Sequence, residues 1–453
     1  MLAPLRVMGL GGAFAAYAEG VDALASNAAS PAVREPFSVA WYDYDYSVSL
    51  AFPAALRGTD FDNDGKVGFA YDNFVFYTLG GLLQIGPIGV GVLGDFQRYD
   101  LSPNAGASDL RVTETLGRVH GVVGVSLFGG QMAVGAGIRA VTLSLDSTTS
   151  SSAASLTIID ARKSSLTMDG VGPQIGVLIR PDDQPWRIGA TYRAKVEGTP
   201  TEKLFGIVGG GAATDVPFAI PGSVRLPWEV EAGFVIQVGP RPLNPKWLDP
   251  KRQRAQLRQQ IAEDRAARQR AQEAELRGIA DPSEMYARAS ELARQEMYVR
   301  REEQARLEQA DAQLLLERKA RYWNWPRERI TVLGEVLVTG PSRDAIGLES
   351  FFSEQSQPTG QPQQSGALTS VSPRLGLEGE PVSDLLQMRI GTYVEPSRFR
   401  GVVARQHFTF GLDVRLGAWS VFGIAGDQVW RISAMTDLAP RYENFGVSVG
   451  AWH

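Results

Sequence analysis

The 453-residue chain contains no cysteine and only three histidines, which are His120, His407 and His453. The lack of cysteine excludes disulfide scaffolds, thiolate nucleophiles and zinc or iron–sulfur centres with cysteine ligands. The histidines lie far apart in the sequence, which argues against a histidine-rich metal site. The formal net charge of -5 offers no large positive field, so no nucleic acid partner is expected.

Two further absences concern catalysis and helical membrane spans. The chain has no Gly-x-Ser-x-Gly elbow and no His-Glu-x-x-His pair, so we expect neither an enzyme nor a cofactor. His407 precedes Thr409 in an alternating segment, and a hydrogen-bonding histidine explains it better than a hydrolase dyad. The uncharged run 73–94 is long enough for a membrane helix, but its many glycines favour a β-hairpin that turns at 86–87.

Outside residues 249–322, apolar residues alternate with polar or small ones. In residues 42–52, apolar side chains occupy the even positions, and the odd positions include Asp43 and Asp45. This period of two indicates strands with one apolar and one polar face. The predicted strands are 37–56, 66–80, 87–99, 111–128, 131–146, 165–180, 186–197, 223–239, 328–340, 368–378, 385–396, 404–416, 418–430 and 441–452.

Short and long connections alternate between these strands. The tight turns are expected at 86–87, 129–130, 181–185 and 417, and the long connections at 100–110, 147–164, 198–222 and 341–367. An even strand number with this loop pattern is typical of outer-membrane barrels, although the strands of a soluble β-sandwich alternate equally well. The strands are long for a sandwich and suit a tilted membrane crossing, which favours the barrel.

Charged residues are concentrated in residues 249–322, which are rich in helix-forming residues and contain a single glycine, Gly278. We predict helices over 249–279 and 283–322, separated at Asp281-Pro282, with Ser283 as the N-cap of the second. A near-heptad stripe on the second helix favours an antiparallel hairpin. Its candidate partner-binding residues are Leu292, Val299, Leu307 and Leu314. A solvated appendage that only rigidifies the barrel explains the same pattern.

We therefore predict an all-β fold: a 14-stranded antiparallel outer-membrane β-barrel with an N-terminal plug and a long α-helical hairpin insertion. The predicted divisions are a plug over 1–34, strands 1–8 over 35–246, the hairpin insertion over 247–325 and strands 9–14 over 326–453. Strand parity places the hairpin on the short-turn side, which is periplasmic in such barrels. Residues 1–12 lack the layout of a secretory signal, so we expect either a removed signal or a misassigned start.

The N-terminal segment resembles the opening of FadL-type outer-membrane transporters. It reads Arg6-Val-Met-Gly-Leu-Gly-Gly-Ala-Phe14-Ala-Ala-Tyr17, and an Asn27 to Pro31 stretch follows in which the Asn and Pro are not adjacent as they are in that family. Segments 186–193, 226–234, 389–396 and 405–411 also resemble strands of the family. The resemblance implies a plugged fourteen-strand barrel that passes hydrophobic molecules such as long-chain fatty acids. The family also includes components of envelope machinery.

Candidate ligand-binding residues come from the plug and from the lumen face of the strands. Phe14, Tyr17 and Leu24 are placed to line an apolar path, although simple plug packing explains them equally well. An arginine on the lumen face can bind a carboxylate headgroup with two hydrogen bonds. The candidates of this kind are Arg193, Arg389 and Arg405.

Asp60, Asp62 and Asp64 have the acidic spacing of a calcium loop and end at Gly65. The glutamate expected at the twelfth position is missing, because Tyr71 stands there. A polar hairpin turn explains the same residues and is the favoured interpretation. The alternative is that this loop binds Ca²⁺.

Taken together, these features predict a transporter in the outer membrane of a Gram-negative cell, with outer-membrane lipid around it and the hairpin in the periplasm. Hydrophobic small molecules would pass by passive transfer through the plugged lumen. The alternative is a structural barrel that recruits a periplasmic or envelope protein complex through the hairpin.

Overall fold

The computed structural model describes residues 3–34, 42–53, 59–66, 72–101, 110–149, 164–200, 222–246, 250–347, 364–419 and 428–451. The chain divides into two compact units. One contains residues 1–35, 41–244 and 326–453, and the other contains residues 36–40 and 245–325. The first is a barrel with an internal plug, and the second is a helical hairpin.

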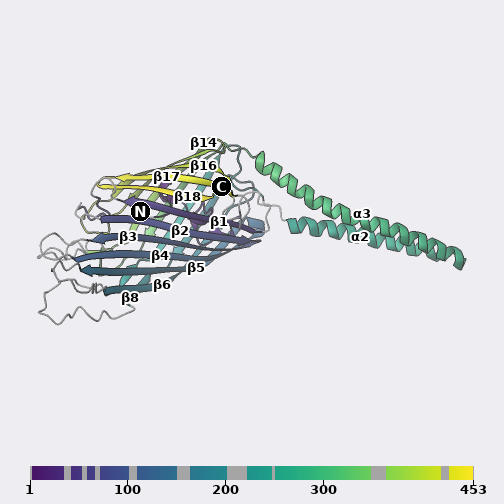
Figure 1. Cartoon of the computed structure of the whole chain (residues 1–453), viewed down its shortest axis with the longest axis horizontal. Helices are drawn as coiled ribbons and strands as arrows, with labels where there is room; N and C mark the ends of the chain where they lie inside the picture. The colour runs from purple at the N-terminus through teal and green to yellow at the C-terminus, as the bar shows by residue number, and fades with distance from the viewer. Residues whose placement is uncertain are drawn as a thin grey trace, which may run out of the picture. The chain divides into compact units, whose positions relative to one another are not determined.

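Fourteen of the described strands form one closed antiparallel sheet. They are β1 (Tyr42–Pro53), β2 (Asp72–Ile85), β3 (Ile88–Leu101), β4 (Leu110–Leu127), β5 (Met132–Thr149), β6 (Ser164–Ile179), β7 (Trp186–Arg193), β10 (Glu229–Val238), β11 (Ile330–Thr339), β14 (Ser370–Val382), β15 (Leu386–Glu395), β16 (Arg405–Trp419), β17 (Gln428–Ala439) and β18 (Tyr442–Ala451). The first strand closes the sheet by pairing with the last, with Leu50 opposite Val447 (Figure 1). The predicted 14-stranded antiparallel barrel is confirmed.

The two faces of the barrel wall differ as the period of two predicts. On β1, Val48, Leu50 and Phe52 are exposed on the outer surface, whereas Ser47 and Ser49 are buried on the lumen side. A similar alternation recurs along most other strands, so the outside is mainly apolar and most charged strand residues are buried inside. An apolar outer band on a closed barrel suits a hydrocarbon environment, because every strand edge is paired.

Two predicted strands are broken in the structure. Segment 186–197 divides into β7 and β8 (Val196–Pro200), and segment 223–239 divides into β9 (Val224–Leu226) and β10. Both breaks lie beside one guanidinium group: Nη2 of Arg139 donates hydrogen bonds to the carbonyl oxygens of Ala194 and Pro227 at 2.9 and 2.8 Å. A side chain thus satisfies these half-buried carbonyl groups, which have left the hydrogen-bond ladder of the sheet.

The predicted turn at Gly417 and the predicted strand 418–430 are wrong. Strand β16 continues to Trp419, and β17 begins at Gln428. The glycine marks a shift in register, since Arg415 pairs with Arg431 but Gly417 pairs with Trp430. Stacked rings of Trp419 and Trp430, 5.2 Å apart, follow this irregularity. A glycine at a bulge carries the same local signal as a glycine in a turn.

Residues 3–34 lie inside the barrel, where they contact buried side chains of β7, β14 and β17. They form α1 (Leu5–Gly9) and two single-turn helices, η1 (Val21–Ala23) and η2 (Ser30–Ala32). All but a few of these residues are buried. The remaining short elements are η3 (Phe128–Gly130), β12 (Ala345–Ile346) and β13 (Gln364–Ser365).

Glycines in the wall let the plug backbone approach closely. A Cβ atom built on Gly189 would lie 2.3 Å from the carbonyl oxygen of Ala15. One built on Gly135 would lie 1.9 Å from that of Ala28. Both distances are far below van der Waals contact, so only glycine fits while the plug keeps this position.

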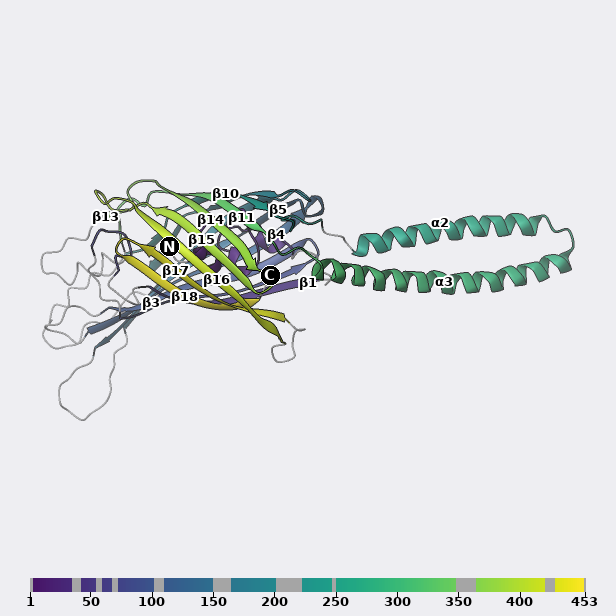
Figure 2. The same cartoon turned by 90° about the horizontal axis from the view of Figure 1, so that it is seen from above.

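The second unit contains α2 (Pro250–Arg277) and α3 (Pro282–Trp323), which run antiparallel (Figure 2). The predicted N-cap is wrong by two residues, because Asp281 caps α3 by accepting the backbone N–H of Ser283. Pro282 then takes the first helical position, where its missing N–H costs nothing. Among the described residues, no helix combines the length and apolar character of a membrane span.

The close approach at Gly189 leads to a test of plug docking. In Gly189→Val, the new side chain collides with the backbone of Ala15 and Ala16, so the plug must shift. Overpacking of this kind costs about 1–3 kcal/mol. We expect the barrel to insert, but to unfold at a lower temperature in heat-modifiable gel shifts and to conduct more ions in planar bilayers.

The matched control is Gly81→Val, because a Cβ atom on Gly81 meets nothing within 4 Å. Its gel shift and conductance should match those of the unmodified protein. Equal behaviour of the two variants would contradict the role assigned to Gly189.

Candidate functional site

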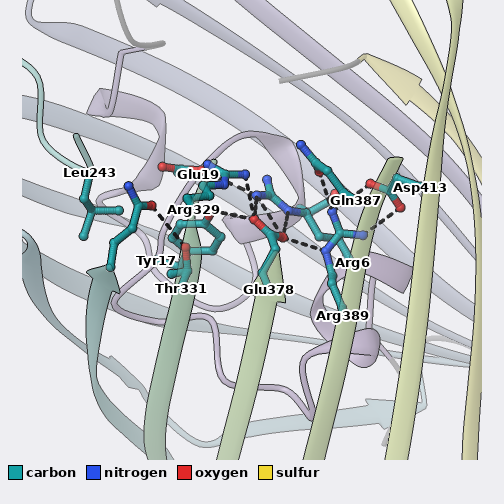
Figure 3. A network of polar contacts seen from close by, with 12 residues as sticks. Arg6, Tyr17, Glu19, Leu243, Arg329, Thr331, Glu378, Gln387, Arg389 and Asp413 are labelled. Carbon is teal, nitrogen blue, oxygen red and sulfur yellow. Dashed lines mark hydrogen bonds and ion pairs between the residues drawn. The ribbon is translucent and has the colours of Figure 1, made fainter. Parts of the chain in front are cut away.

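A buried carboxylate on β14 joins the plug to the barrel wall. Glu378 accepts hydrogen bonds from Arg6 and Tyr17 of the plug, with distances of 3.3 Å from Nη2 and 2.7 Å from the hydroxyl. It also accepts 2.9 Å and 2.6 Å bonds from Arg329 and Arg389 of the wall. Figure 3 shows these donors pointing to Glu378 from the plug and from neighbouring strands. The residue is 1% exposed, so water cannot replace the donors.

The network continues around the lumen from this carboxylate. Arg389 binds both oxygens of Asp413 at 2.7 Å (Figure 3). Asp413 also accepts a 2.8 Å bond from Arg431, which reaches Asp22 of the plug at 3.0 Å. The plug is thus tied to the wall at both ends of one chain of alternating charges. Breaking one link of such a buried chain leaves the remaining charges unpaired.

Other contacts hold the rest of the plug. Glu335 on β11 accepts the backbone N–H groups of Phe14 and Ala15 at 2.9 and 2.7 Å. Arg187 on β7 donates to the carbonyl oxygen of Tyr17 and to Glu19, at 2.7 and 2.9 Å. Burial opposes the negative charge of Glu19. The positive charges of Arg187, Arg6 and Arg329 nevertheless lower the pKa of Glu19 to about 2. The plug is anchored by charge-assisted bonds rather than by apolar packing alone.

A cavity of about 400 Å³ lies beside the plug. Ala3, Val7, Ala25 and Ser26 form its plug side, and residues of the connections 54–71, 340–369 and 396–404 contribute at the other side. Ten of its lining residues carry ionisable acidic or guanidinium groups: Asp62, Asp95, Arg118, Arg139, Arg193, Glu229, Glu231, Arg374, Glu395 and Arg398. The described cavity therefore combines many charged groups with apolar surface, to which Val7, Leu337 and Phe399 contribute.

The three plug residues predicted to bind ligand are buried in apolar packing. Phe14 and Tyr17 meet edge to face with ring centroids 5.3 Å apart, and both belong to one core cluster. Leu24 belongs to another cluster, with Leu82 and Leu93 of the wall. None of the three lines the described cavity. Their role in ligand binding stays a prediction.

The three predicted headgroup arginines all have acidic partners. Arg193 pairs with Glu229 and Glu231, and of the three only Arg193 lines the cavity. Arg389 is occupied by Glu378 and Asp413, as described above. Arg405 pairs with Glu395 and also donates to backbone oxygens of the loop that contains Asp60. Binding an anionic ligand at any of them would require these pairs to rearrange.

His407 is held on both ring nitrogens. Nδ1 lies 2.8 Å from Asp437 and Nε2 lies 3.0 Å from Glu395, and Tyr393 stacks on the ring at 4.2 Å. Tyr393 itself donates to Asp437 at 2.8 Å. With both nitrogens engaged, this arrangement supports the hydrogen-bonding role that the sequence favours.

Sequence reasoning missed the residues that connect plug and wall, chiefly Glu378, Glu335 and Arg374. The signal was available on β14, where Ser372, Arg374 and Glu378 are buried between exposed apolar neighbours such as Leu375 and Leu377. Alternation identifies these charges as lumenal, but it does not say which residues across the barrel they meet.

The loop 59–66 brings Asp60, Asp62 and Asp64 together, with one oxygen from each within 4.8 Å of the others. Asp60 accepts the backbone N–H groups of Asp64 and Gly65 at 3.0 Å, and Asp64 accepts that of Lys66 at 2.7 Å. Burial raises the pKa of Asp60 despite the opposing charge of Arg405. These bonds are those of a polar turn. The twelfth position, Tyr71, lies outside the described residues.

The predicted partner-binding stripe of α3 lies partly inside the hairpin. Leu292 is 7% exposed, and Val299, Leu307 and Leu314 are half-buried. Glu303 shares this face and binds Arg265 and Arg268 of α2. Hydrogen bonds from these arginines lower the pKa of Glu303. The stripe therefore holds the two helices together, and its role toward a partner stays a prediction.

Glu378→Gln tests the link between plug and wall. The amide removes the charge that faces three buried guanidinium groups, which should cost about 3–5 kcal/mol. We expect a lower transition temperature in heat-modifiable gel shifts and a larger conductance in planar bilayers. Glu197→Gln is the control, since its pair with Arg225 is exposed and worth at most about 1 kcal/mol. A Glu378→Gln barrel as stable and as closed as the control would contradict this role.

Calcium titration tests the acidic loop. Because the observed hydrogen bonds are those of a polar turn, calorimetry with millimolar Ca²⁺ should give a flat titration. Saturable binding that Asp62→Asn weakens about tenfold would instead make this loop a calcium site. A flat titration of the unmodified protein would leave the polar turn as the complete explanation of these residues.

No family model matches the chain, and no curated protein matches it. Several solved barrels do match. The CymD monoaromatic hydrocarbon channel is 10% identical, with 99% of this chain and 96% of that chain covered and a TM-score of 0.47. The Pseudomonas putida toluene transporter TodX is also 10% identical, with 99% and 97% covered and a TM-score of 0.47. CdiB from Acinetobacter baumannii is 7% identical, with 91% and 60% covered and a TM-score of 0.37.

Proposed function

We propose that this protein is an outer-membrane channel that transfers small molecules passively past a plug. One observation carries the proposal: residues 3–34 occupy the lumen of a closed barrel with an apolar outer face, and leave a cavity of about 400 Å³ beside them. A barrel that served only as a membrane anchor would need neither a plug nor a cavity. Ligand pockets in proteins commonly have this size.

The cargo we propose is a small hydrophobic molecule, such as a long-chain fatty acid. Its basis is the resemblance of residues 6–31 to FadL-type transporters. The described cavity offers both charged groups and apolar surface, so a molecule with an apolar body and a polar group suits the lumen better than a pure hydrocarbon. In this proposal the plug moves during passage, which loosens the hydrogen bonds that hold it to Glu378 and Glu335 of the wall.

The proposed location is the outer membrane, with the long connections outside the cell and the hairpin in the periplasm. The insertion joins β10 to β11, so the chain leaves the barrel at the same end as the two-residue turn between β2 and β3. Short turns of outer-membrane barrels are periplasmic. Surface proteolysis of intact cells should therefore spare α2 and α3.

An uptake assay tests the channel. Vesicles that contain the folded barrel should take up labelled hexadecanoate faster than vesicles without it, and Glu378→Gln should raise the rate further by loosening the plug. If vesicles that contain inserted, heat-modifiable protein take up hexadecanoate no faster than vesicles without it, the transport proposal is refuted.

A second candidate function is recruitment of a periplasmic or envelope complex. It is favoured by aromatic side chains that project from α3, since Tyr286 and Tyr298 are 77% and 66% exposed. Exposed aromatics of this kind are enriched at protein interfaces. Deleting residues 249–322 separates the two functions. A channel should keep its uptake rate, whereas an adaptor should insert but lose the proteins that co-purify with it.

A further inference from the structure

The arginines that line the cavity differ in their partners. Arg139 binds Glu229 at 2.6 Å, and Arg193 pairs with Glu229 and Glu231. Arg374 binds Glu231 and Glu335 at 2.8 and 2.9 Å. Arg118 lies 3.8 Å from Asp95. Each of these four guanidinium groups has a carboxylate neighbour that offsets its burial.

Arg398 is the exception among these cavity arginines. Its hydrogen bonds run to neutral acceptors: Ser370 Oγ at 3.2 Å, and the carbonyl oxygens of Gly340 and Gly366 at 3.0 and 3.4 Å. Within the described part of the chain, no carboxylate forms an ion pair with it. Burial lowers the pKa of Arg398, and the more distant charge of Glu229 only partly opposes this effect. A half-buried guanidinium without a counterion is costly unless an anion joins it.

The surroundings of Arg398 hold its guanidinium in place and add hydroxyl groups. Three chain segments fix the side chain, namely the end of β11, the turn after β13 and the start of β14. A Cβ atom on Gly366 would lie 2.7 Å from Nη2 of Arg398, so this residue packs directly against the guanidinium. Further hydroxyl-bearing residues line the cavity, namely Thr339, Ser365 and Ser370. Ser372 lines it too, but its hydroxyl already donates to the carbonyl oxygen of Val394 at 2.6 Å.

These hydroxyls suit an anion. Ser370 accepts the bond from Arg398 with its oxygen, so its proton is available to a ligand. A fixed guanidinium beside hydroxyl donors is the arrangement that binds carboxylate or phosphate oxygens, because charge-assisted bonds are the strongest of this kind.

We propose that Arg398, with Ser370 and the neighbouring hydroxyls, forms an oxyanion-binding subsite in the cavity. This subsite binds a carboxylate or a phosphate. A neutral hydrocarbon has no acceptor oxygen with which to bind the guanidinium group. The inference rests on the proposed transport function and narrows its cargo to molecules that carry an oxyanion. None of the sequence-predicted arginines fills this role without breaking an existing pair.

The test is calorimetry on the full-length folded protein in detergent, with sodium benzoate, inorganic phosphate and benzyl alcohol as probes. Benzoate and benzyl alcohol share a ring and differ in the carboxylate. We expect benzoate to bind more tightly than benzyl alcohol, Arg398→Gln to weaken benzoate binding at least tenfold, and Arg398→Lys to keep part of the affinity. Phosphate binding that also depends on Arg398 would identify a general oxyanion site, and binding of benzoate alone a site for organic carboxylates.

Arg400→Gln is the matched control, because Arg400 is an exposed arginine on the same connection between β15 and β16 and does not line the cavity. Its affinities should equal those of the unmodified protein, and every variant must show the normal heat-modifiable gel shift. Benzoate binding unchanged by Arg398→Gln, equal binding of benzyl alcohol, or no binding of either anion would overturn the subsite. Uptake of hexadecanoate by vesicles would still stand in those cases, whereas loss of uptake in the unmodified protein would remove the transport proposal itself.

Discussion

The burial of charge inside a closed barrel is the constraint on which the structure depends. The outer wall must be apolar, so alternation turns most polar side chains of the strands toward the lumen. Charges there are beyond the reach of bulk water once the plug fills the space, and each needs a partner. Glu378 shows the result, because two donors from the plug and two from the wall share one carboxylate.

This constraint ties the position of the plug to the composition of the wall. Acidic and basic groups place the plug in one orientation, and glycines such as Gly189 and Gly135 leave room for its backbone. Ion pairs and close backbone packing differ in how strongly they resist movement of the plug. Close backbone packing resists any shift, whereas ion pairs can exchange partners, so movement of the plug would begin along the chain of charges from Arg6 to Asp22.

The charged side chains that line the cavity bear on which cargo the proposed channel would take. Phe14, Tyr17 and Leu24 are packed in the core, and the cavity is lined by ion pairs and hydroxyls as well as by apolar side chains. A cargo that uses this space must make hydrogen bonds there, because buried polar groups that lose their partners are costly. The subsite at Arg398 offers such bonds without breaking a pair.

Local pattern determined much of this protein. The period of two and the loop lengths predicted the barrel and its strand number, and composition alone separated the helical hairpin from the rest. Errors came where one residue type serves two structures, as when Gly417 marked a bulge and not a turn, or where Asp281 rather than Ser283 capped a helix. Only the tertiary structure decided which charges meet. Arg6 and Glu378 are 372 residues apart, and closure of the barrel brings them together, which no local pattern encodes.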